Sequence, residues 1–79
     1  MAQIKVKYQD KKQVFEVENK PVSLKYLMYL FEHKMNIPYY EELDFKIDGK
    51  TIYSGKKQDL DSFISFLLSE SKEYEMQFI

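Results

Sequence analysis

Apolar and polar residues alternate in several short stretches of the chain, and this period of two predicts half-buried β-strands. The clearest stretches are residues 3–8 and 13–18 near the start, residues 43–47 in the middle and residues 73–79 at the end. Residues 50–53 add a short return strand after the middle one. We therefore expect two hairpins and a closing strand.

Polar turns separate the strands of both predicted hairpins. Residues 9–12 form a polar run between the first two strands. Asp48-Gly49 is a strong signal for a two-residue type I′ turn, because both central positions of that turn need a positive φ. The second hairpin is thus expected to turn at these two residues.

One segment, residues 24–35, has the spacing of an amphipathic helix. Ser23 is a suitable N-cap, Asn36 is a suitable left-handed residue after the helix, and Pro38 prevents its continuation. The stripe expected to face the sheet comprises Leu24, Leu27, Met28, Phe31 and Met35.

A second, shorter helix is predicted before the last strand. Asp59 can cap it, and the apolar residues between 60 and 68 recur at helical spacing, with Ser62, Ser65 and Ser69 on the wet side. The order is then ββαββαβ, an α+β class with a mixed four- or five-stranded sheet packed on one main helix, in a single domain over residues 1–79. The expected core comprises Ile4, Val6, Phe15, Val17, Leu24, Leu27, Phe31, Leu43, Phe45, Ile47, Leu60, Ile64, Leu67, Met76 and Phe78.

Four local matches occur in an order that resembles ubiquitin and its β-grasp relatives. They are a Gln-Ile-x-Val-Lys strand at residues 3–7, a helix ending just before Ile37-Pro38, Leu-x-Phe at residues 43–45, and Gly49-Lys50 in a turn. The resemblance covers nearly the whole chain as a pattern. It implies a ubiquitin-like β-grasp fold.

The chain departs from ubiquitin in ways that bear on function. It ends in a predicted strand rather than in a Gly-Gly tail, so we do not expect a conjugated modifier. The segment before the last strand looks more helical than ubiquitin's. Small tail-less proteins of this kind resemble the bacterial ubiquitin-like proteins that accompany type VII secretion, so an accessory role in a bacterial secretion or phage system is an alternative. The outer sheet face, apolar in ubiquitin, is expected to be charged here, through Lys5, Lys7, Glu16, Glu18, Asp44, Lys46, Glu75 and Gln77.

The predicted main helix has a second face that points away from the sheet. Tyrosine is typical of interface anchors, so this face is a candidate for binding a protein partner or a second copy of the chain. The alternatives are that the predicted 60–68 helix covers it, or that these residues are ordinary scattered exposure. The first candidate contact residues are Tyr26, Tyr29, Leu30 and His33, with Tyr39 and Tyr40 in the following loop. The alternating lysines and glutamates of the outer sheet face are the second candidate surface.

The composition of the chain argues against most other classes of function. The chain has no cysteine, one histidine and a formal charge of −1, with acids and lysines mixed throughout. We therefore expect no enzyme activity, no metal or cofactor, and no nucleic-acid partner. No apolar run approaches a membrane span, and the start of the chain carries no signal peptide, so a cytoplasmic protein is expected. A small non-covalent protein-binding adaptor is the preferred function, with a structural homo-oligomer as the rival.

Overall fold

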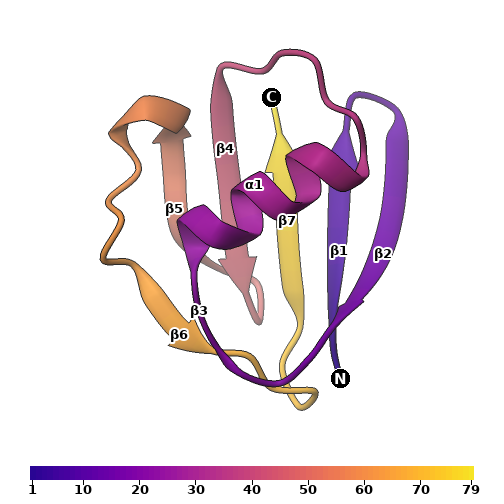
Figure 1. Cartoon of the computed structure of the whole chain (residues 1–79), viewed down its shortest axis with the longest axis vertical. Coiled ribbons are helices and arrows are strands. Elements are labelled where there is room, and N and C mark those ends of the chain that lie inside the picture. The colour runs from indigo at the N-terminus through magenta and orange to yellow at the C-terminus, as the bar shows by residue number, and fades with distance from the viewer.

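A computed structural model, which describes all of residues 1–79, has one helix packed on a mixed five-stranded sheet (Figure 1). The sheet order is β2-β1-β7-β4-β5, and β3 pairs separately with β6. The elements are β1 (Ala2–Tyr8), β2 (Lys11–Val17), β3 (Pro21–Ser23), α1 (Leu24–Lys34), β4 (Glu42–Ile47), β5 (Lys50–Lys56), the 3-10 helix η1 (Lys57–Asp59), β6 (Ser65–Leu67) and β7 (Tyr74–Phe78).

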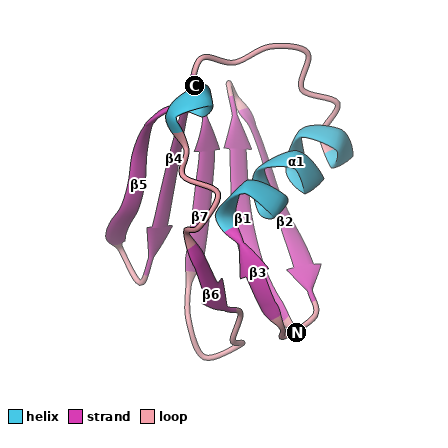
Figure 2. Cartoon of the chain, turned by 60° about the vertical axis from the view of Figure 1, so that its left-hand side comes forward, coloured by secondary structure: helices cyan, strands magenta, loops and turns pink.

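The first and last strands lie side by side at the centre of the sheet. β1 and β7 run parallel, with Val6 opposite Met76, and β7 runs antiparallel to β4, with Met76 opposite Phe45. Hairpins add β2 and β5 at the two edges. α1, β3 and β6 all lie on one side of this sheet (Figure 2). The other side is left without a covering layer.

The hairpin turns follow from backbone chemistry. Ile47 is opposite Lys50, and the two residues between them, Asp48 and Gly49, have φ values of 51° and 78°. This is the predicted two-residue turn. The first hairpin also turns in two residues, since Tyr8 pairs with Lys11. The second strand therefore begins two residues earlier than the pattern predicted.

The residues predicted to flank the main helix do so at both of its ends. The Ser23 hydroxyl accepts a hydrogen bond from the backbone N–H of Tyr26 at 3.0 Å, which satisfies one of the free donors of the first turn. Asn36 has a φ of 51°, the left-handed conformation that closes many helices. The main helix thus forms one residue shorter than predicted.

Replacing Ser23 by alanine removes this cap. We expect the free energy of unfolding to fall by about 1 kcal/mol, the usual effect of losing an N-cap acceptor. Chemical denaturation followed by circular dichroism measures the change. Ser23→Asp restores an acceptor and should recover most of the loss, whereas equal losses in both variants would contradict the capping role.

The core lies between α1 and the sheet. Met28 and Phe31 from α1 are fully buried, and the Phe31 ring stacks on that of Phe15 with centroids 5.0 Å apart. A second aromatic group joins Phe45, Phe66 and Tyr74 under β6. Of the predicted core, eleven residues are buried: Ile4, Val6, Val17, Leu24, Leu27, Phe31, Leu43, Phe45, Leu60, Met76 and Phe78.

The predicted second helix does not form. Residues 57–59 make a single 3-10 turn, and residues 65–67 make strand β6, which pairs antiparallel with β3. Leu67, predicted in the core, is 62% exposed, and Phe63 is 87% exposed. Phe15, Ile47 and Ile64 are only partly buried against the core.

The local chemistry explains why helical spacing was misleading here. Serine, isoleucine and phenylalanine are all weak helix formers, and they make up most of residues 62–66. The Asp61 side chain accepts from the backbone N–H of Phe63, a local turn contact that competes with a helix. The segment instead pairs with β3, and the backbone N–H of Leu24 bonds the Ile64 carbonyl at 2.9 Å. Strand pairing with a distant segment therefore overrides the local period.

Candidate functional site

The outward face of α1 carries an uncovered aromatic stripe. Tyr26 and Tyr29 are 44% and 52% exposed, and His33, one turn further along, is also exposed. Residues three and four apart are neighbours on a helix surface, so these side chains form one continuous strip. The segment after β5 does not cover them, because β6 packs beside β3 at the start of the helix. We call Tyr26, Tyr29 and His33 the helix strip.

Two of the predicted contact residues lie differently. Leu30 is half-buried and packs against the core. Tyr40, expected in the exposed patch, is only 6% exposed, and its ring meets the edge of Phe78 at 4.7 Å between centroids. Tyr39 is exposed, but its backbone carbonyl accepts from Tyr8 of β1, so it lies beyond the end of the sheet.

The burial of Tyr40 creates a polar cluster between three segments. Its hydroxyl donates to a carboxylate oxygen of Glu32 on α1, and the Lys57 ammonium lies 3.7 Å from the same oxygen and 4.8 Å from the centre of the Tyr40 ring. Burial, and then the hydrogen bond to Glu32, raise the pKa of Tyr40 above its ordinary value. The cluster ties the loop after α1 to both the helix and η1, which makes it a structural joint.

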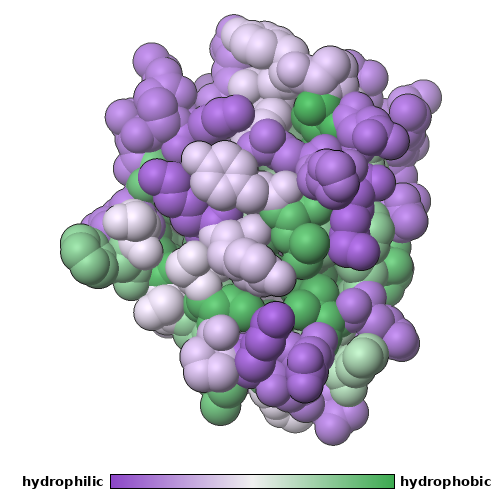
Figure 3. All heavy atoms as spheres, in the orientation of Figure 1, coloured by the Kyte–Doolittle hydropathy of each residue, from purple (hydrophilic) through white to green (hydrophobic).

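Apolar atoms also reach the surface on the side of the molecule that carries α1. Figure 3 shows such atoms beside the helix, framed by polar groups. Phe63 and Leu67, both largely exposed, lie in the segment that packs next to β3. Three residues separate them in the sequence, and neither lines a pocket with the helix strip among the five main hollows of the surface.

The opposite face of the sheet is charged, as the alternation of residues predicted. Six of the predicted outer residues are exposed, and Lys7 and Asp44 are partly so. The strand register arranges them in rows across the sheet. One row runs Lys12, Lys7, Gln77, Asp44; the next runs Val14, Lys5, Glu75, Lys46.

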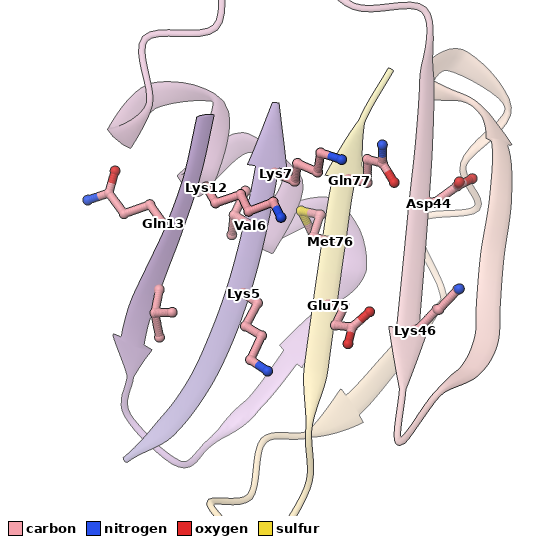
Figure 4. Close-up of a pocket in the computed structure, with 11 residues that line it drawn as sticks. Lys5, Val6, Lys7, Lys12, Gln13, Asp44, Lys46, Glu75, Met76 and Gln77 are labelled. Carbon is pink, nitrogen blue, oxygen red and sulfur yellow. The ribbon is translucent and has the colours of Figure 1, made fainter. Parts of the chain in front are cut away.

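These rows enclose a shallow groove with a volume of about 440 Å³. Figure 4 shows the side chains of β1, β2, β4 and β7 around it, with Lys12 pointing from β2 toward β1. Its four lysines are Lys5, Lys7, Lys12 and Lys46, and its two acids are Asp44 and Glu75. We call this the lysine groove.

Two members of the lysine groove were missed in the sequence. The pattern predicts a four-residue turn that contains Lys12, whereas the structure has a two-residue turn and places Lys12 in β2. Val14, which is 54% exposed, lies on the outer face because its neighbour Phe15 packs inward against Phe31. Both residues could have been placed on the outer face from the sequence, because they alternate with the inward-facing Phe15 and Val17 of the same strand.

No family model, curated protein or solved structure matches this chain. No group of three or more His, Cys, Asp or Glu side chains is arranged to hold a metal ion. α1, the longest helix, has 11 residues, and no helix here has the length and apolarity needed to cross a membrane.

Proposed function

We propose that this chain is a ubiquitin-like β-grasp domain that binds another protein non-covalently through the helix strip. The parallel pairing of the first and last strands, with one helix across a single face, supports the β-grasp assignment. The segment before the last strand contains only the short 3-10 helix η1 and no α-helix, so the longer helix inferred from the sequence as a departure from ubiquitin is absent.

One observation carries the functional proposal: two tyrosine rings stand exposed on a helix face that no other element covers. Tyr26 and Tyr29 supply large, rigid contact area at low entropic cost, which is why tyrosine is enriched at binding hot spots. The Lys20 ammonium lies 5.4 Å from the Tyr26 ring centre and adds a positive charge to one end of the strip. A partner with an apolar cleft and an acidic rim fits this chemistry.

The first test is the oligomeric state of the wild type and of Tyr29→Glu, measured by light scattering. The alternative is that the partner is a second copy of the chain, in which case a charge at Tyr29 should convert a wild-type dimer into a folded monomer. Thr51→Glu, at an exposed site on β5, is the matched control and should leave the dimer intact. Loss of the dimer in both variants would contradict a role specific to the helix strip.

A monomeric wild type would leave a different protein as the partner. A photo-crosslinking amino acid at position 29 should then capture a protein that the same group at position 71, an exposed site before β7, does not. The captured protein, once purified, should bind the wild type and lose about tenfold or more in affinity for Tyr29→Glu. Equal affinity for both variants would overturn the proposal.

A further inference from the structure

We infer that the lysine groove is a second binding surface, which takes an extended acidic polypeptide segment lying along β1. The groove is on the side of the sheet away from α1, so its occupant and a partner on the helix strip do not compete for space. The chain would then hold two proteins at once, one on each side of the sheet.

None of the groove lysines forms an ion pair within the protein. The two ion pairs of the structure join the Met1 amino group to Glu70 and Lys57 to Glu32. Glu75 lies between Lys5 and Lys46 in its row, so these two lysines are partly compensated. The other two lysines of the groove, Lys7 and Lys12, have no acidic side chain opposite them in their row.

Lys7 and Lys12 are directly opposite each other on neighbouring antiparallel strands. Like charges in this position destabilise a sheet, and the next residue in the row, Gln77, is neutral. Nothing in the packing of the core requires lysine at either position, because both side chains lie on the outer face. A bound carboxylate between the two ammonium groups would remove the repulsion.

The spacing of the lysines selects the form of the occupant. Lys5 and Lys7 are two residues apart on one strand, which separates their Cα atoms by roughly 6.6 Å. An extended segment has the same repeat, so glutamates at alternate positions can reach Lys5 and the Lys7–Lys12 pair together. The amide of Gln77 lines the same groove and can bond the backbone of the segment.

The same groove is poorly suited to nucleic acid. No aromatic side chain lines it, so there is no platform on which a base can stack. The chain has no arginine, the residue whose planar fork best matches phosphate. Asp44 and Glu75 would repel a continuous phosphate backbone, whereas separate carboxylates can be placed away from them.

The test uses the full chain and a labelled peptide of repeating Glu-Ser, about twelve residues long, in a fluorescence anisotropy titration. Lys7→Gln combined with Lys12→Gln should weaken binding about fivefold to tenfold. The control combines Lys50→Gln with Lys72→Gln, which removes the same charge from exposed lysines outside the groove, and should retain wild-type affinity. Tyr29→Glu should also bind the peptide normally, which separates this result from the helix strip.

Three other results would overturn the inference. Equal weakening in the groove variant and its control would mean that only the overall charge matters. A peptide with glutamate at every third position that binds equally well would remove the alternate-spacing argument. Inorganic phosphate or an oligothymidine that displaces the peptide at similar concentration would reassign the groove to phosphate.

Discussion

Replacing Phe31 by alanine should lower the free energy of unfolding by about 3–5 kcal/mol. Phe31 has no exposed surface, lies in the C-terminal half of α1 and stacks on Phe15. Its removal leaves a cavity where the helix meets the sheet, and a domain of 79 residues has little stability to spare. Urea denaturation followed by circular dichroism measures the loss.

Two further variants keep this prediction testable. Tyr29→Ala removes an aromatic ring from the exposed side of the same helix and should change stability by less than about 0.5 kcal/mol. Phe31→Leu keeps most of the buried volume and should be folded, with an intermediate loss, even if Phe31→Ala does not fold. A similar small loss for Phe31→Ala and Tyr29→Ala would contradict the placement of Phe31 in the core.

Replacing Tyr40 by phenylalanine should cost about 1.5–3 kcal/mol at neutral pH, because its hydroxyl donates to the charged Glu32 carboxylate. The ring can still pack against Phe78, so the change isolates the hydroxyl. Thermal and urea denaturation of the two proteins at pH 7 measure the difference. A difference under about 0.5 kcal/mol would show that the hydrogen bond gives no net stability.

The difference in stability between wild type and Tyr40→Phe should also depend on pH. The pKa of Tyr40 is raised in the folded protein above the ordinary value of 10.0, so the folded state keeps this proton at a pH where the unfolded chain loses it. The contribution of Tyr40 is thus fully present below about pH 10 and falls as the pH rises further. The stability gap between wild type and Tyr40→Phe should narrow above pH 10.

Two other tyrosines have raised pKa values, but they do not confuse this comparison. The hydrogen bond to Glu41 raises the pKa of Tyr39, and burial raises that of Tyr53. Both residues are present in wild type and in Tyr40→Phe, so their effects cancel in the difference. If the difference in free energy of unfolding between wild type and Tyr40→Phe stayed constant from about pH 7 to 11, the protonated hydroxyl of Tyr40 would not be a source of stability.

Local sequence patterns predicted the strands and the helix that bury one face against the core. Alternation placed the strands of the main sheet, and the stripe containing Leu27 and Phe31 placed α1, because one face of each element must meet the core. The charged outer face followed from the same parity. Asp48-Gly49 fixed the register of its hairpin through the positive φ that both residues adopt.

The errors arose where a distant segment decides the local structure. Strand β6 exists because Pro21–Ser23 is available to pair with it, and nothing within residues 60–68 indicates that pairing. Tyr40 is buried because Glu32 and Lys57 meet over it, from elements on either side in the sequence. The exposure of Tyr26, Tyr29 and His33 and the charge of the outer face were predicted, whereas the pairing of Lys7 with Lys12 is visible only in the strand register.

The central position of β7 has a consequence for how the protein is made. Ile4 pairs with Tyr74, so the middle of the sheet joins residues from the two extremes of the chain. Until residues 74–78 leave the ribosome, the two hairpins have no strand to join them, and their apolar faces stay open to other chains. Such long-range closure makes folding slow for a chain of this size. Newly made copies should be most prone to aggregate in the interval before β7 is inserted.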